Sequence, residues 1–243
     1  MTDKKVVLIT GATGGIGEFL VGAFAAERYR IAIHFKQNEQ QSKCLEKIVN
    51  SKGGEGLALK ADISKSEEVK DLVKKIVSKW GKIDLLINNA GVCVPEIFLR
   101  LSEANWDRTI KANLSGTFFC LRETAKMMIN DRQGSIINIG SIIGVRGGIG
   151  DAGYSAAKSG LIALTKTAAR ELGKFNIRVN AVLPGCHQTP MLGANSPAIL
   201  ERARKESVLS LTTSGEELAK FVVFLSQMET VSGQVFNWDS RII

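Results

Sequence analysis

The sequence predicts an α/β protein with a doubly wound, seven-stranded parallel sheet and helices on both faces. Three observations support this class. Short apolar runs rich in β-branched residues alternate along the chain with segments of helical periodicity. The first apolar run ends at a cluster of glycines and passes at once into a helical segment. Short glycine-containing or polar sequences also follow four of the predicted strands, at 11–17, 88–91, 141 and 184–185. The carboxyl ends of parallel strands form one edge of the sheet, and such sheets bind ligands at that edge.

The size and charge of the chain fit one large domain. At 243 residues it can bury a sizeable core, and we expect a single domain over 1–243. Its 32 basic and 24 acidic side chains give a net charge of +8, but the sequence holds no run of five basic residues. Nucleic-acid binding is therefore not predicted. The excess charge either covers a solvated surface or attracts an anionic cofactor or an acidic carrier protein.

The sequence also indicates the cellular location of the protein. Residues 1–5 are mostly polar and lead directly into the first strand, so we expect no signal peptide. No apolar run is long enough to span a bilayer, and we expect a cytoplasmic protein with no membrane partner. The four cysteines form no Cys-x-x-Cys pair and the chain has two histidines, so we expect free thiols and no metal site.

The first strand, predicted at 6–9, runs into the turn Thr10-Gly11-Ala12-Thr13-Gly14-Gly15-Ile16-Gly17, and a helix is predicted at 18–28. Glycines let the backbone turn sharply and let a bulky ligand approach it. The start of the helix presents free N–H groups and the positive end of its dipole. The turn therefore predicts an anion site, and the usual occupant of such a site is the pyrophosphate of a dinucleotide.

The remaining elements follow in order. Further strands are predicted at 30–35, 57–60, 84–87, 134–140, 177–183 and 234–237. Helices are predicted at 37–52, 69–80, 102–130, 154–174, 198–208 and 216–227. Ser64 and Glu67 form the pattern of a capping box before the helix at 69–80. Residues 188–213 have no firm pattern, and we expect them to form a mobile substrate lid whose Met191, Leu192, Ile199 and Leu200 suit an aliphatic chain.

The second half of the chain carries a candidate for acid–base chemistry. Tyr154 and Lys158 are four residues apart on a predicted helix and share one face, and Ser141 follows the fifth strand. A nearby ammonium favours the phenolate, so we expect the pKa of Tyr154 to fall toward neutral pH. The hydroxyl of Ser141 is placed to hold a carbonyl oxygen. Taken alone, a Tyr-x-x-x-Lys pair is more often an ordinary surface pair.

Several motifs together resemble the short-chain dehydrogenase/reductase family over nearly the whole chain. They are the Thr-Gly-x-x-x-Gly-x-Gly turn at 10–17, Asp62, Asn88-Asn89-Ala90-Gly91, the set Asn113, Ser141, Tyr154 and Lys158, and Pro184-Gly185 with Thr189. The resemblance implies a Rossmann domain that binds a nicotinamide dinucleotide. The residues implied to bind it are Thr10, Gly11, Thr13, Gly14, Gly15, Ile16, Gly17, Lys36, Asp62, Ile63, Asn89, Ala90, Gly91, Tyr154, Lys158, Pro184, Gly185 and Thr189.

The same resemblance implies roles for a catalytic tetrad. Tyr154 gives a proton to the carbonyl oxygen of the substrate while the nicotinamide delivers hydride to the carbonyl carbon. Ser141 orients and polarises the carbonyl. Lys158 lowers the pKa of Tyr154 and binds the nicotinamide ribose, and Asn113 holds a water that connects Lys158 to solvent. The cofactor supplies the redox chemistry, and the protein supplies placement and electrostatics.

The end of the second predicted strand bears on the choice of cofactor. An acid at this place would accept the ribose hydroxyls of NAD, but the sequence has Phe35 followed by Lys36. A missing acid and an added cation favour a 2′-phosphate, so we expect NADPH to be preferred, with NAD as the alternative. Gly14 counts against this preference, because NADP-preferring relatives often place a basic residue there. Lys36 also fits a plain solvated loop lysine.

Within the family, the chain most resembles bacterial 3-oxoacyl-[acyl-carrier-protein] reductases, on its residues 140–144, 154–158 and 178–185. The resemblance implies NADPH-dependent reduction of a 3-oxoacyl thioester, carried by acyl carrier protein or CoA, as in fatty acid biosynthesis. Arg132 matches one basic position that holds the acidic carrier, although it also suits a cation at a helix end. A second such position is Phe175 here, with Lys174 adjacent.

The resemblance further implies a homotetramer, formed through the helices at 102–130 and 154–174 and the last strand. Two departures affect these regions: Asp239-Ser240-Arg241 replaces the usual Asp-Gly-Gly, and Thr213-Ser214-Gly215-Glu216 lacks the usual proline. Two other functions stay open. One is oxidoreduction of another ketone or secondary alcohol, such as a small carbonyl, a sugar or a steroid. The other is a non-catalytic redox sensor that only binds the cofactor.

Overall fold

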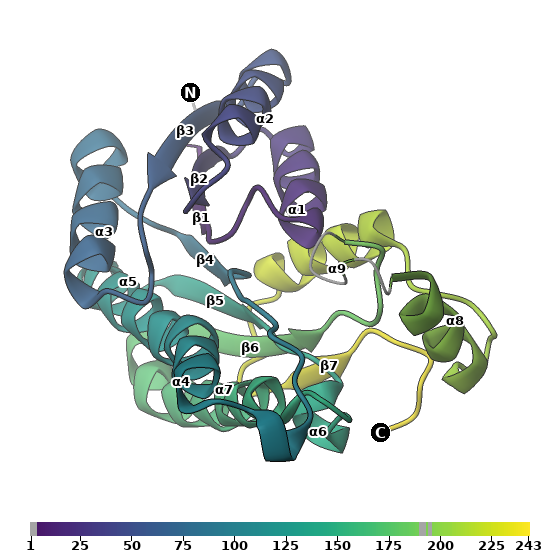
Figure 1. Ribbon diagram of the computed structural model, residues 1–243. Coiled ribbons are helices and arrows are strands. Elements are labelled where there is room, and N and C mark those ends of the chain that lie inside the picture. The colour runs from purple at the N-terminus through teal and green to yellow at the C-terminus, as the bar shows by residue number, and fades with distance from the viewer. Residues whose placement is uncertain (1–3, 190–192, 194–195) are drawn as a thin grey trace.

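The computed structural model describes residues 4–189, 193 and 196–243. Within these residues, seven parallel strands form one sheet in the order β3-β2-β1-β4-β5-β6-β7 (Figure 1). The strands are β1 (Val6–Ile9), β2 (Arg30–Phe35), β3 (Glu55–Lys60), β4 (Leu85–Asn88), β5 (Gly134–Ile139), β6 (Ile177–Leu183) and β7 (Val235–Asn237). The order reverses between β1 and β4, which is the switch point where ligands bind in such sheets. The predicted fold class is confirmed.

The helices cover both faces of the sheet. They are α1 (Gly15–Ala26), α2 (Glu39–Ser51), α3 (Ser66–Trp80), α4 (Glu103–Ile110), α5 (Gly116–Asp131), α6 (Ile143–Arg146), α7 (Ala152–Leu172), α8 (Ser196–Glu206) and α9 (Gly215–Gln227). Short 3₁₀ turns lie at Phe98–Arg100 and Gly173–Phe175. The apolar residues of α1, α2 and α9 pack in one core cluster, and those of α3, α5 and α7 pack in the other.

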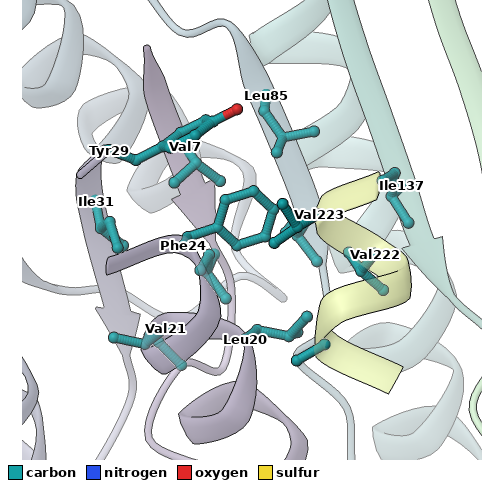
Figure 2. Close-up of a cluster of buried hydrophobic side chains, with 14 of the residues drawn as sticks. Val7, Leu20, Val21, Phe24, Tyr29, Ile31, Leu85, Ile137, Val222 and Val223 are labelled. Carbon is teal, nitrogen blue, oxygen red and sulfur yellow. The ribbon is translucent and has the colours of Figure 1, made fainter. Parts of the chain in front are cut away.

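The alternation of side chains along the strands creates these two cores. In β1, Val7 and Ile9 join the first cluster, whereas Val6 and Leu8 join the second. Figure 2 shows the first cluster, in which Phe24 of α1 lies among strand residues and the valines of α9. The Phe24 ring meets the Tyr29 ring edge-on, with 5.1 Å between centroids. Strands covered on both sides need continuous apolar runs, and this explains the pattern of the sequence.

The helix predicted at 102–130 is wrong as one element. It consists of α4 and α5 joined by a π-helical turn at Lys111–Ser115. Ser102 caps α4 by accepting a hydrogen bond from the Asn105 amide at 3.2 Å. The π turn adds a residue to the helical path, and such insertions are frequent at functional sites. Here the inserted turn carries Asn113, which is fully buried.

Two other predictions concern the start of α3 and the lid at residues 188–213. The capping box is wrong: α3 begins after Lys65, and the Ser64 hydroxyl donates to Asp62 Oδ1 at 2.7 Å. The Glu68 carboxylate, one residue later than expected, accepts the Asp62 amide at 2.7 Å. In the predicted lid, α8 occupies Ser196–Glu206, and Met191 and Leu192 lie outside the described residues. The mobility of the lid stays a prediction.

Candidate active site

The candidate site lies at the carboxyl edge of the sheet, and Thr10 joins two of the strand ends there. Its hydroxyl oxygen accepts the amides of Asn89 and Ala90, both at 3.0 Å, and its hydroxyl is 3.3 Å from the Ile87 carbonyl. The segment after β4 is thereby fixed against the end of β1. The side-chain amide of Asn89 also donates hydrogen bonds to the carbonyls of Thr10 at 3.1 Å and Gly11 at 2.9 Å.

The glycine turn packs closely against neighbouring parts of the protein. Gly11 has a φ of +62°, and a Cβ there would lie 2.7 Å from the Ala90 Cα. A Cβ on Gly17 would lie 2.7 Å from the Ala12 carbonyl oxygen. At Gly14, by contrast, the nearest neighbour of an added Cβ is a carbonyl oxygen at 3.4 Å. The turn is packed on its inner side and leads into the N-terminal amides of α1, which fits the binding of a pyrophosphate.

The segment after β6 folds over this turn. The Thr189 methyl group packs on Gly15, where an added Cβ would lie only 2.5 Å from it. The carbonyl of Pro184 contacts the buried His187 ring through Nε2 at 2.5 Å and accepts the Thr213 hydroxyl at 3.3 Å. Gly185 has a φ of +77°. These contacts place the Pro-Gly segment and Thr189 at the same edge as the glycine turn, and His187 serves as a loop contact.

Lys36, which is expected to favour a 2′-phosphate, contacts Asp62, another residue implied to bind the cofactor. Lys36 Nζ lies 2.7 Å from Asp62 Oδ2, so the ends of β2 and β3 are joined by an ion pair. Burial raises the pKa of Asp62, but hydrogen bonds from Lys36 and Ser64 outweigh it and hold the pKa below its ordinary value. The Ile63 side chain is buried in the core against Gly116, so a cofactor contact at Ile63 would use main-chain atoms.

Three of the proposed catalytic residues meet just beyond β5. Lys158 is buried, and its Nζ donates to the Ile139 carbonyl at 2.7 Å and lies 5.7 Å from the centroid of the Tyr154 ring. Ser141 is hydrogen-bonded to the Tyr154 side chain, and its oxygen also accepts the Ile143 amide at 3.2 Å. Tyr154 and Lys158 lie one turn apart on α7, as their spacing predicts.

Asn113 joins the π turn to this group. Its side-chain amide donates to the carbonyls of Val92 at 2.8 Å and Thr109 at 2.9 Å, and its Oδ1 accepts the Val92 amide at 3.1 Å. A Cβ on Gly91 would lie 2.5 Å from Asn113 Oδ1 and 3.9 Å from Lys158 Nζ. A side chain at position 91 would therefore displace the tip of Asn113, which lies beside the ammonium of Lys158.

The expected fall in the pKa of Tyr154 is wrong for this structure. Burial is the largest influence and raises the pKa of Tyr154. Cys93, once its thiol ionises at high pH, and the Asp151 carboxylate raise this pKa further, and the Ser141 hydrogen bond lowers it. Burial also lowers the pKa of Lys158 to about 8. Spacing predicts that the two side chains share a face, but it does not predict how far both are removed from water.

Two side chains that influence Tyr154, Cys93 and Asp151, were not predicted to do so from the sequence. Cys93 Sγ lies 3.5 Å from Asp151 Oδ1, and both groups act on the Tyr154 phenol. Burial raises the pKa of Asp151, and burial with the Asp151 charge raises the pKa of Cys93 to about 12. Cys93 is therefore a thiol at neutral pH and a poor nucleophile. The sequence places Asp151 three residues before Tyr154, which is about one helical turn, and this spacing could have indicated their proximity.

The predicted carrier residues lie together away from the tetrad. Arg132 ends α5 in a left-handed conformation with a φ of +49°, and its Nη2 donates to the Lys174 carbonyl at 3.1 Å. Lys174 Nζ lies over the Phe175 ring, 5.1 Å from its centroid. The guanidinium thus caps the turn after α7 rather than the carbonyls of its own helix.

Among residues 4–189, 193 and 196–243, no group of three or more His, Cys, Asp or Glu side chains is placed to hold a metal ion. In the same described part of the chain, no helix is both long and apolar enough to cross a membrane.

Comparison with known proteins identifies the family. The model of the short chain dehydrogenase family matches residues 5–199. The chain is 36% identical over 236 residues to 3-oxoacyl-[acyl-carrier-protein] reductase FabG of Staphylococcus epidermidis, covering 96% of this chain and 97% of the relative. It is 38% identical over 253 residues to the protein of the same name from Thermotoga maritima, covering 99% and 98%. For the Staphylococcus aureus protein of this name, the identity is 34% over 239 residues, covering 98% and 97%. The chain therefore belongs to the short-chain dehydrogenase/reductase family and is an oxidoreductase.

Proposed function

We propose that this protein reduces a 3-oxoacyl thioester to the 3-hydroxyacyl form with NADPH. One observation carries the proposal: Ser141, Tyr154, Lys158 and Asn113 converge at the sheet edge that also holds a glycine turn. The curated relatives named above support the choice of substrate, because each is named for reduction of a 3-oxoacyl group on acyl carrier protein. A cytoplasmic location fits this chemistry.

The side chains divide the work of reducing a carbonyl. When bound, the reduced nicotinamide supplies the hydride. The Ser141 hydroxyl holds the carbonyl oxygen, and the Tyr154 hydroxyl donates its proton to that oxygen. Burial keeps Tyr154 protonated at neutral pH, which is the form that reduction needs. The Lys158 ammonium stabilises the phenolate that is left, and Asn113 places the π turn beside that ammonium.

The dinucleotide would lie along the strand ends. The amides at the start of α1 would hold the pyrophosphate, and the segment at Asn89–Gly91 with Pro184, Gly185 and Thr189 would line the nicotinamide end. Lys36 and Asp62 would meet the adenosine. Because the Lys36 side chain is 59% exposed and its ammonium needs only to leave the Asp62 carboxylate, it is available to a 2′-phosphate. This availability supports NADPH over NADH.

Lys36 gives a direct test of cofactor choice. We expect Lys36→Met to lower kcat/KM for NADPH about tenfold while changing that for NADH less than about twofold. Lys43→Met is the matched control, because Lys43 is an exposed lysine of α2 that pairs with Glu39. Equal losses with both cofactors would contradict the role of Lys36. Loss of NADPH selectivity in the Lys43 variant would point to a general effect of charge.

The substrate class is tested by a cofactor-by-substrate panel. Acetoacetyl-CoA, an acetoacetyl thioester of acyl carrier protein and simple ketones are each tried with NADPH and with NADH. We expect the two thioesters to give the highest kcat/KM, with the carrier-bound form favoured by the basic charges of Arg132 and Lys174. Turnover of simple ketones with no reduction of either thioester would reject the proposal in favour of another carbonyl substrate.

A further inference from the structure

His34 is a buried histidine whose ring contacts both the glycine turn and the segment that precedes Asp62. It lies near the end of β2 with 2% of its surface exposed. Its Nδ1 accepts the Gly11 amide at 3.0 Å, and its Nε2 lies 3.0 Å from the Ala61 carbonyl oxygen. Gly11 opens the glycine turn, and Ala61 directly precedes Asp62. A single imidazole ring therefore connects the turn to the segment expected to meet the adenosine.

The two contacts determine which nitrogen carries the proton. A backbone N–H can only donate, so Nδ1 must accept from Gly11. A carbonyl can only accept, so Nε2 must donate to Ala61. The ring is therefore the neutral Nε2–H tautomer. A proton on Nδ1 would place two donors against each other inside a buried contact, and one of the two would lose its partner.

The electrostatic surroundings keep this form dominant. Burial lowers the pKa of His34, and the hydrogen bond to Ala61 and the charge of Asp62 raise it by less. Asp62 is the charged group that acts on the ring from the β3 side, and its carboxylate is paired with Lys36 from the ring's own strand. The glycine turn on the other side contributes Thr10, Gly11 and Ala12, whose side chains do not ionise.

The ring completes a clamp on the Gly11 peptide unit. Asn89 donates to the Gly11 carbonyl at 2.9 Å from the β4 side, and His34 accepts the Gly11 amide from the β2 side. The His34 carbonyl also accepts the Ala12 amide at 2.9 Å. Gly11 has a positive φ, which sets the direction of the turn that follows. Holding this residue on both sides fixes where the turn presents its amides to a phosphate.

We propose that His34, as the neutral Nε2–H tautomer, is a positioning residue that holds the glycine turn and the start of the 61–63 segment in the arrangement that binds the dinucleotide. This role rests on the proposed function, because it assumes that the turn binds a dinucleotide. His34 touches the backbone of the turn and contributes to binding through it.

Two variants separate the hydrogen bond from the volume of the ring. His34→Asn keeps an acceptor near the place of Nδ1, whereas His34→Leu fills similar space with an apolar group. We expect NADPH Kd at neutral pH to rise at least about tenfold in His34→Leu but stay within about threefold of wild type in His34→Asn. The kcat at saturating NADPH should be nearly equal in all three proteins. Wild-type affinity in His34→Leu, or an equal loss in both variants, would overturn the role.

A spectroscopic measurement on the wild-type protein keeps the proposal testable if a variant does not fold. Long-range ¹H–¹⁵N spectra report the tautomer of each histidine, and the chain has two, so His187→Gln assigns both rings. We expect His34 to be protonated on Nε2 alone and to show no titration near about pH 6.5. An Nδ1–H tautomer or an imidazolium at that pH would overturn it. Failure of the wild type to bind either dinucleotide would instead reject the proposed function and, with it, this role.

Discussion

Lys158 is a single residue whose proposed catalytic role lowers the stability of the folded protein, because its charge is buried. Burial lowers its pKa to about 8, from about 10.4 in an unfolded chain. Below pH 8 the lysine is charged in both states, and the folded state bears the full cost of burying that charge. As the pH rises from about 8 to about 10.4, the folded protein releases this proton first and the cost disappears.

We expect Lys158→Met to be more stable than the wild type at neutral pH while losing turnover. The gain follows from removing a buried charge and is on the order of 3 kcal/mol at most. Thermal unfolding from neutral pH to about pH 10 checks it, since the difference should shrink as the pH rises. A variant that is less stable than the wild type at neutral pH would show that the ammonium stabilises the fold.

Some residue roles were readable from the sequence and others were not. The shared face of Tyr154 and Lys158 follows from helical spacing, and the structure places both beside Ser141. The Lys36–Asp62 pair and the contacts of His34 join the ends of neighbouring strands, so they depend on sheet order and register. The rise in the pKa of Tyr154 depends on burial, which spacing does not contain.

At the scale of elements, a buried chain of polar side chains holds α7 on the sheet. The Asn88 amide donates to Asn138 Oδ1 at 2.9 Å, and the Asn138 amide donates to the Thr165 hydroxyl at 2.9 Å. This chain runs from β4 through β5 to α7, the helix that carries Tyr154 and Lys158. The network therefore sets the position of the proposed acid relative to the strand ends.

We expect Thr165→Val to lower the free energy of unfolding by about 1–3 kcal/mol, because it leaves the buried Asn138 amide without its acceptor. Thr165→Ser is the matched control, since it keeps the hydroxyl and should retain most of the stability. Chemical denaturation measures both variants. If the valine and serine variants are destabilised equally, the hydrogen bond to Asn138 does not control the stability at this position.

The elements themselves were predicted where local pattern decides them. The strands at 30–35 and 177–183 match the structure at both ends, because turn-forming and polar residues border their apolar runs. The π turn at Lys111–Ser115 was missed, because helical periodicity continues across it and only tertiary contacts of Asn113 mark it. The short helix α6 lies in a glycine-rich loop, where periodicity carries little information.

At the scale of the whole molecule, large apolar side chains remain exposed on the elements expected to form subunit contacts. Trp106 on α4 is 39% exposed, and Phe118 on α5 is 38% exposed. Exposed apolar surface of this kind often marks protein interfaces. It fits the proposed homotetramer, in which α5, α7 and the last strand meet symmetry mates.

We expect light scattering to give a mass of about 105 kDa, which is four times 26.3 kDa. Phe118→Glu should shift the mass toward a smaller assembly, because it introduces a charge on α5, in the proposed interface. Lys220→Glu introduces a negative charge on α9, outside the proposed interface, and serves as the control. A wild-type mass of one subunit at micromolar concentration would contradict the tetramer.

In the proposed reaction, Tyr154 protonates a 3-oxoacyl carbonyl while the nicotinamide reduces it. The most direct measurement follows deuterium from NADPH labelled at its transferable ring position into the product, with mass spectrometry of the acyl group. We expect one deuterium at C3 of the 3-hydroxyacyl thioester with the wild type. Tyr154→Phe should bind NADPH with nearly the same Kd and form no labelled product. Labelling of C3 by Tyr154→Phe at the wild-type rate would contradict the role of Tyr154 as the acid. Absence of label in the wild-type product would contradict the proposed reduction.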